Sequence, residues 1–94
     1  MDVKDAVRSA INYIAEIFGP ENPENIGLEE VVFNDVEDVW DITIGFSRPW
    51  DYKKLVFLPN SFQAQNPERQ YKIVRIDNKS GKVKSIKIRE IKIE

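Results

Sequence analysis

The sequence predicts an α+β domain in which an N-terminal amphipathic helix packs on a curved antiparallel sheet of four to five strands. Three observations lead to this prediction: a helical stripe of apolar residues opens the chain, alternating apolar segments follow, and turn residues separate those segments. The chain has 94 residues, and 41% of them are hydrophobic. This is enough for one core, so residues 1–94 are expected to form a single domain.

The helix is predicted within the first eighteen residues, where apolar side chains recur with the three- and four-residue spacing of one helix face. These residues are Val3, Ala6, Val7, Ala10, Ile11, Ile14, Ile17 and Phe18. Asp2 is expected to cap the N-terminus, and Asp5 completes a capping-box arrangement. Gly19 and Pro20 are expected to end the helix, with Gly19 in a left-handed conformation.

The next segments predict strands. Residues 21–27 have the composition of a loop, and the first strand is expected at 28–33. The second strand is the most regular, because its apolar residues alternate with polar ones and place one face in the core. Those apolar residues are Trp40, Ile42, Ile44 and Phe46. The opposite face is expected to be solvated or thinly covered.

The C-terminal part predicts a hairpin with strands at 70–77 and 82–93, joined by a tight turn in which Gly81 has a positive φ. The apolar residues of the last strand change faces twice, so bulges are expected near Ser85 and at 89–90. Between the two hairpins, we interpret residues 53–58 as a short strand and residues 59–67 as a loop.

The residues from Tyr71 to Ile88, YKIVRIDNKSGKVKSIKI, resemble the strand–Asp–x–x–x–Gly–x–Val–strand signature of PepSY-type domains. The order of predicted elements also resembles cystatin-like folds. With Trp40 in a Trp-x-x-x-Ile strand context, the chain is similar to short gas-vesicle accessory proteins as well. The resemblance omits residues 48–67. It implies a non-catalytic domain, often inhibitory or regulatory, and carries over no catalytic residue.

The chain contains no cysteine and no histidine. Disulfides, thiolate nucleophiles, histidine-based triads and most zinc sites therefore lack the residues that build them. The carboxylates lack the spacing of a calcium loop, and we interpret them as solvated surface. We therefore expect no enzyme, no metal site and no cofactor. The absence of cysteine, of a signal sequence and of a long apolar run favours a cytoplasmic protein with no membrane contact.

The segment after Pro49 is the first candidate partner-binding surface. Aromatic and basic side chains concentrate binding energy at protein interfaces. The candidate contacts are Trp50, Tyr52, Lys53 and Lys54. The alternative is that this segment folds back and completes the core.

The C-terminal hairpin is the second candidate, because residues 67–94 contain 9 basic and 4 acidic side chains, whereas residues 1–66 contain 5 and 12. The basic patch consists of Arg69, Lys72, Arg75, Lys82, Lys84, Lys87 and Arg89. Either it binds an anionic ligand or nucleic acid, or the two halves of the chain neutralise each other within one sheet. Nucleic acid is the weaker prediction, because few aromatic residues accompany the basic ones.

The expected function is that of a non-catalytic protein-interaction module, such as an inhibitor, an immunity-type protein or an accessory assembly factor. A protein partner is expected, and the isoleucine-rich last strand also allows a homodimer through an edge strand.

Overall fold

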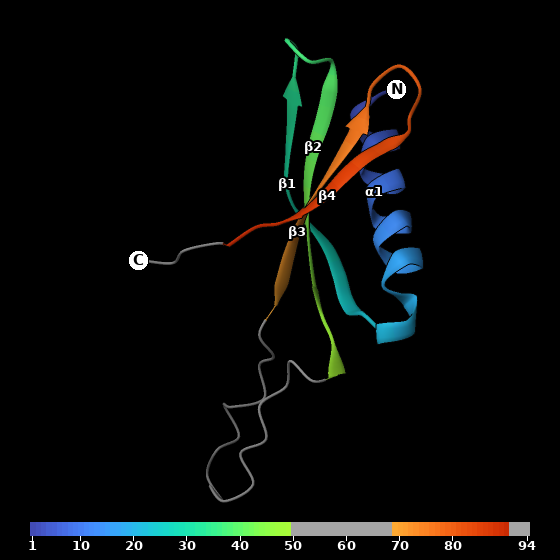
Figure 1. Ribbon diagram of the computed structural model, residues 1–94, viewed down its shortest axis with the longest axis vertical. Helices are drawn as coiled ribbons and strands as arrows, with labels where there is room; N and C mark the ends of the chain where they lie inside the picture. The colour runs from blue at the N-terminus through green and yellow to red at the C-terminus, as the bar shows by residue number, and fades with distance from the viewer. Residues whose placement is uncertain (50–68, 91–94) are drawn as a thin grey trace, which may run out of the picture.

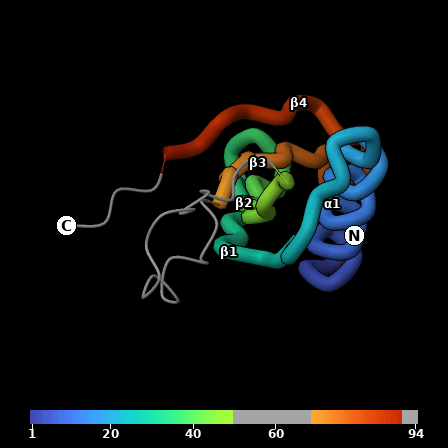
Figure 2. Tube along the Cα trace, turned by 90° about the horizontal axis from the view of Figure 1, so that it is seen from below, coloured from blue at the N-terminus to red at the C-terminus, as the bar shows by residue number. Residues whose placement is uncertain are grey.

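The computed structural model describes residues 1–49 and 69–90. Its elements are α1 (Val3–Ile17), a 3₁₀ turn η1 (Gly19–Glu21), β1 (Glu24–Asn34), β2 (Val39–Ser47), β3 (Gln70–Asp77) and β4 (Val83–Ile88). The four strands form one antiparallel sheet in the order β1-β2-β3-β4, and α1 lies on one face of it (Figures 1 and 2). The predicted α+β class, a helix on an antiparallel sheet, is confirmed.

The start of α1 agrees with the sequence prediction, and α1 ends at Ile17, shortly before Gly19 and Pro20, as expected; only the predicted left-handed conformation of Gly19 is wrong. The Asp5 N–H donates to Asp2 Oδ1 at 2.9 Å, and the Asp2 N–H donates to the Asp5 carboxylate, which completes the capping box. The left-handed residue is Asn22, with φ of 52°, and not Gly19. Pro20 holds a φ that suits a helical turn, so the chain makes one 3₁₀ turn before it reverses.

Strand β1 begins at Glu24, so the prediction of a loop over residues 21–27 is wrong for its last four residues. The register with β2 shifts between Glu24 and Gly27 and again between Leu28 and Glu30. These bulges break the two-residue alternation by which a strand is recognised in a sequence. Asn25, with φ of 56°, sits inside the first irregularity.

The β3–β4 hairpin has the predicted turn and one of the two predicted bulges. Gly81 has φ of 73°, which confirms its positive-φ position in the turn. The register shifts between Arg75 and Ile76, where Lys84 is the extra residue beside Ser85. The strand ends at Ile88, so its predicted continuation through 89–90 is wrong.

The core lies between α1 and the central strands. Its fully buried members are Ala6, Ala10 and Ile14 from α1, Ile42, Ile44 and Phe46 from β2, and Val74 and Ile76 from β3. The two alanines let the helix approach the sheet closely. The rings of Phe18 and Phe46 meet at 4.9 Å between centroids, which closes the core at the C-terminal end of α1.

The helix is too narrow to cover the whole sheet. A helix with its side chains is about 10–12 Å across, whereas four strands spaced about 4.8 Å apart make a wider layer. Accordingly, α1 packs mainly on β1, β2 and β3. Leu28 on β1 is 45% exposed and Ile88 on β4 is 76% exposed, although both lie on the helix side of the sheet. Apolar surface therefore remains open on both sides of α1.

Candidate protein-interaction surface

The first set of predicted contact residues, Trp50, Tyr52, Lys53 and Lys54, lies outside the described residues, as do the strand predicted at 53–58 and the loop at 59–67. The second set, the basic patch, lies on β3, on β4 and at their flanks, and all seven of its residues are described.

Arg75 lies at the centre of the sheet face that points away from α1. Its Nε and Nη2 donate to the two carboxylate oxygens of Asp41 at 2.8 and 3.0 Å, and its Nη1 donates to Glu37. This two-pronged pairing is the geometry in which arginine binds a carboxylate most strongly. The hydrogen bond to Asp41 and the negative charge of Asp41 raise the pKa of Arg75 above its ordinary value. Arg75 is therefore occupied within its own sheet.

Two further arginines cross the same face. Arg69 Nη2 donates to Glu29 at 3.1 Å, directly above Gly45, where an added Cβ would lie 2.7 Å from the Arg69 side chain. Arg89 donates to Glu30 and, at 2.7 Å, to Thr43 Oγ1. Thr43 is only 2% exposed as a result. Within the described part of the chain, the face of β2 that was expected to be solvated or thinly covered is covered at its centre by arginine side chains alone.

These pairs join the basic C-terminal hairpin to the acidic N-terminal half of the chain. Arg69, Arg75 and Arg89 contact carboxylates that belong to β1, β2 or the turn between them. The contacts are those expected if the two halves neutralise each other within one sheet. Each guanidinium would have to leave a carboxylate before it could bind an external phosphate.

The lysines of the basic patch do not form one surface with these arginines. Lys72 lies on the helix side of the sheet, with its Nζ 5.8 Å from the centre of the Phe18 ring. Lys82, Lys84 and Lys87 are exposed, and none of them has an ion pair within residues 1–49 and 69–90. The basic patch is thus divided between the two faces and the end of the hairpin.

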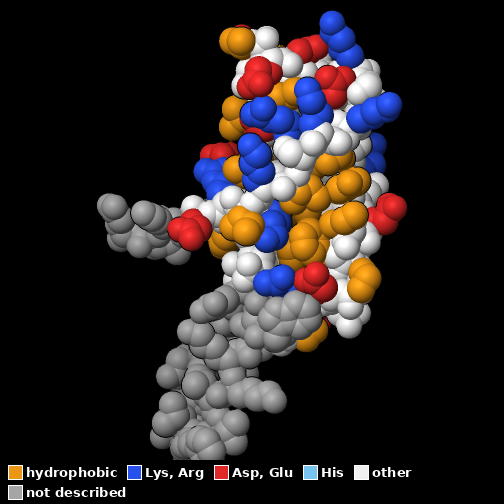
Figure 3. All heavy atoms as spheres, in the orientation of Figure 1, with side chains coloured by type: hydrophobic (Ala, Val, Ile, Leu, Met, Phe, Trp, Pro, Cys, Tyr) orange, Lys and Arg blue, Asp and Glu red, His pale blue; other side chains and the backbone are white. Residues whose placement is uncertain are grey.

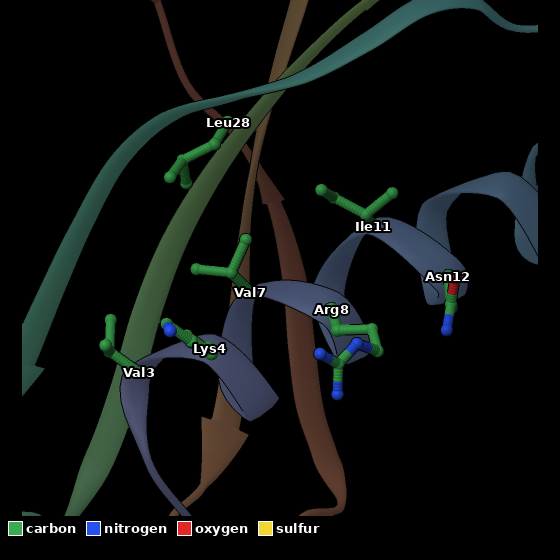
Figure 4. Close-up of a pocket in the computed structure, with 7 residues that line it drawn as sticks. All are labelled: Val3, Lys4, Val7, Arg8, Ile11, Asn12 and Leu28. Carbon is green, nitrogen blue, oxygen red and sulfur yellow. The ribbon is translucent and has the colours of Figure 1, made fainter.

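A groove that was not anticipated from the sequence lies between α1 and β1. Its volume is about 540 Å³, and its apolar lining comes from Val3, Val7, Ile11 and Leu28. Figure 4 shows Val3, Val7 and Ile11 on the side of the helix that faces Leu28. This groove is called the α1–β1 groove below. Val3 is 42% exposed, so part of the apolar stripe of the helix faces the groove and not the core.

The rim of the α1–β1 groove is polar and carries positive charge on the helix side, from Lys4 and Arg8, with Asn12 beyond them. Arg8 also contacts Asp5 at 3.6 Å, but both side chains are more than half exposed. Such an exposed ion pair contributes little to stability, so Arg8 can readily exchange Asp5 for another carboxylate. An apolar floor with a polar rim is the composition of a protein-binding site.

A smaller recess of about 280 Å³ lies on the other side of α1, between the end of the helix and β4. Its apolar lining comes from Ile17, Phe18, Ile86 and Ile88. Figure 3 shows apolar side chains gathered between β4 and α1, below a region of basic side chains. Ile17 is 52% exposed, so α1 leaves apolar surface uncovered at this edge as well.

The width of the apolar stripe on the helix was the signal in the sequence for the α1–β1 groove. The apolar stripe of the helix is broad, and it includes Val3, Val7 and Ile11 beside the fully buried Ala6, Ala10 and Ile14. A single helix on a sheet buries only the central line of such a stripe. The apolar residues beside this central line are left uncovered, and they mark a surface available to a partner.

No protein-family model matches the chain, and neither the curated proteins nor the solved structures yield a match. The resemblance to PepSY-type, cystatin-like and gas-vesicle accessory proteins therefore stays a prediction. Within residues 1–49 and 69–90, no helix has both the length and the apolar character needed to span a membrane. The same residues contain no cluster of three or more carboxylates that would suit a metal ion.

Proposed function

We propose that this chain is a non-catalytic protein-interaction domain and that it presents the α1–β1 groove to a protein partner in the cytoplasm. The groove supports this proposal because it combines a large apolar floor, partly exposed Val3 and Leu28, and a polar rim in one accessible place. Monomeric proteins rarely expose a large continuous apolar patch, so a patch of this kind marks an interaction site.

The chemistry of the opposite face supports the non-catalytic part of the proposal. A hollow of about 310 Å³ lies there, and its ionisable residues include Asp41, Arg75 and Arg89. Each of these side chains is engaged in an ion pair across the sheet. A general acid or base has to be poised to exchange a proton with a substrate, whereas these groups hold strands together.

Site-specific cross-linking tests the proposal. A photoreactive side chain placed at Leu28 would face the α1–β1 groove, and the same group placed at Lys79 would face solvent at the β3–β4 turn. In cells of the native host, we expect discrete protein adducts from position 28 and background adducts from position 79.

The position at Lys79 also tests the alternative in which the basic hairpin binds nucleic acid. Lys82 and Lys84 support that alternative, since both are exposed near the turn. Nucleic-acid adducts from position 79, with none of protein from position 28, would refute the groove proposal. They would favour a phosphate-binding role whose affinity falls steeply with added salt.

A further inference from the structure

We propose that the occupant of the α1–β1 groove is β4 of a second copy of this chain, which adds to the edge of β1 as an antiparallel strand. The inference rests on the proposed function, because it names the partner of that same surface. Added strands bind through main-chain hydrogen bonds, while their alternate side chains enter pockets. The edge of β1 and the groove beside it offer both kinds of contact.

Among residues 1–49 and 69–90, no strand pairs with the outer edge of β1, and β1 is most regular near its C-terminal end. From Glu30 to Asn34 the register with β2 is unbroken, and β1 is the first strand of the sheet order. An edge strand turns alternate N–H and C=O groups away from its neighbour. The segment 30–34 contains neither proline nor lysine, the residues that commonly protect an edge. Val32 is 48% exposed there.

The topology gives a second copy the correct direction. Each strand is antiparallel to the next, so β1 and β4, the two edges of a four-stranded sheet, run in opposite directions. A copy placed beside β1 in the same orientation therefore presents its β4 antiparallel to β1 and keeps its helix on the same face. The two sheets would join into one continuous antiparallel sheet.

The side chains of β4 also point the correct way. Ile86 pairs with Val74 and Ile88 pairs with Lys72, so both isoleucines lie on the helix side of the sheet. In a strand added to β1, they would lie beside Leu28 and above the apolar floor of the groove. Ile88 is 76% exposed in the single chain. Its burial against the groove of a neighbouring copy would therefore remove exposed apolar surface from both copies.

Charge distinguishes this pairing from the pairing of like edges. β1 contains Glu24, Glu29 and Glu30 and no basic residue, whereas β4 contains Lys84 and Lys87 and no acidic residue. Pairing β1 with β1, or β4 with β4, brings like charges together, and like charges on opposed strands are destabilising. Arg69 and Arg89 balance part of the charge of Glu29 and Glu30, but Glu30 remains 49% exposed.

The outer face of the joined sheet adds one specific contact. Glu30 lies opposite Thr43, Thr43 opposite Ile73, and Ile73 opposite Lys87, so Glu30 and Lys87 occupy the same face at opposite edges. A neighbouring β4 would therefore present Lys87 on the face that carries Glu30. Because this contact joins unlike edges, it repeats from copy to copy and gives a ring or an open chain.

A charge exchange between the two edges tests the proposal. The first double variant, Leu28→Lys with Val32→Lys, introduces two lysines at the β1 edge, where Arg69 and Arg89 already balance part of the glutamate charge. The second, Lys87→Glu with Ile88→Glu, introduces two glutamates at the β4 edge. All four positions are exposed, so we expect both variants to keep the circular dichroism of the wild type and a single cooperative unfolding transition. Sedimentation velocity measures association of each protein over a range of concentrations.

We expect the average mass of the wild type to rise with concentration, and each double variant alone to associate roughly tenfold or more weakly. An equimolar mixture of the variants should regain association, because the introduced lysines of one protein then meet the introduced glutamates of the other. Association of the first variant alone at wild-type strength would show β4–β4 pairing. Association of the second variant alone at that strength would show β1–β1 pairing. Either result overturns the proposal.

A wild type that stays monomeric at all concentrations also overturns the proposal of a second copy. The proposed function would survive that result if position 28 still forms adducts with a different protein. Failure of the cross-linking at position 28, together with a monomeric wild type, would refute both.

Discussion

The stability of this fold should depend on the narrow line along which α1 meets the sheet, and Ile14 is the largest residue of the helix on that line. Ile14 is fully buried among Ile42, Ile44 and other core residues. Replacement of a buried isoleucine by alanine removes apolar contacts and leaves a cavity, which costs about 2–5 kcal/mol. A domain of this size has a total stability of roughly 5–14 kcal/mol. Ile14→Ala should therefore remove a large fraction of it.

Ile17→Ala is the matched control, because it makes the same chemical change one turn later on the same helix. Ile17 is 52% exposed beside the recess at β4, so we expect a loss of about 1 kcal/mol or less. Urea unfolding followed by circular dichroism at low protein concentration gives both values. A loss for Ile17→Ala as large as that for Ile14→Ala would refute the idea that α1 buries only the centre of its apolar stripe.

Three further predictions concern the sheet and its turns. Trp40→Phe should cost about 1–2 kcal/mol, measured by urea unfolding, because it removes the indole N–H that donates to Asn78 Oδ1 at 2.9 Å. Gly81→Ala should cost about 1 kcal/mol or more in the same assay, because φ there is 73° and a Cβ would lie 3.2 Å from the Met1 side chain. The Ser80 N–H, which donates to Asp77 Oδ2 at 2.7 Å, lowers the pKa of Asp77 below its ordinary value. The stabilisation from Asp77 is therefore present at neutral pH and is lost as pH falls through the folded-state pKa, so Asp77→Asn should reduce the dependence of stability on acid pH. If the stability of Asp77→Asn depends on acid pH as strongly as that of the wild type, the role given to the Ser80–Asp77 hydrogen bond is contradicted. Wild-type stability of Trp40→Phe or of Gly81→Ala would contradict the role given to the indole hydrogen bond or to the positive φ of Gly81.

The regular elements of the fold were predictable from the sequence because their signals are local. The capping residues of α1 and the alternation along β2 depend only on neighbours in the chain. The early start of β1 was not predictable, since its two bulges interrupt the alternation and Asn25 adopts a left-handed conformation. The conformation of Gly19 was mispredicted because Pro20 favours a 3₁₀ turn, so Asn22 and not Gly19 reverses the chain.

The candidate site was less predictable because it depends on tertiary distances. Composition identified the basic hairpin as a possible surface, but only the register shows that Arg75 reaches Asp41 across the sheet. Val3 and Leu28 are far apart in the sequence, and nothing local indicates that both line the α1–β1 groove. The groove results from the difference in width between one helix and four strands, which is a property of the layers and not of any segment.

Residue-resolved amide hydrogen exchange at increasing protein concentration tests most directly whether the open edge of β1 receives another strand. At high dilution, amides over residues 31–33 that face away from β2 should exchange much faster than those of Ile42 and Ile44. As concentration rises, they should become protected together with amides of Ile86 and Ile88. Slow exchange of the β1 edge at the highest dilution, or protection of β4 without β1, would contradict the account.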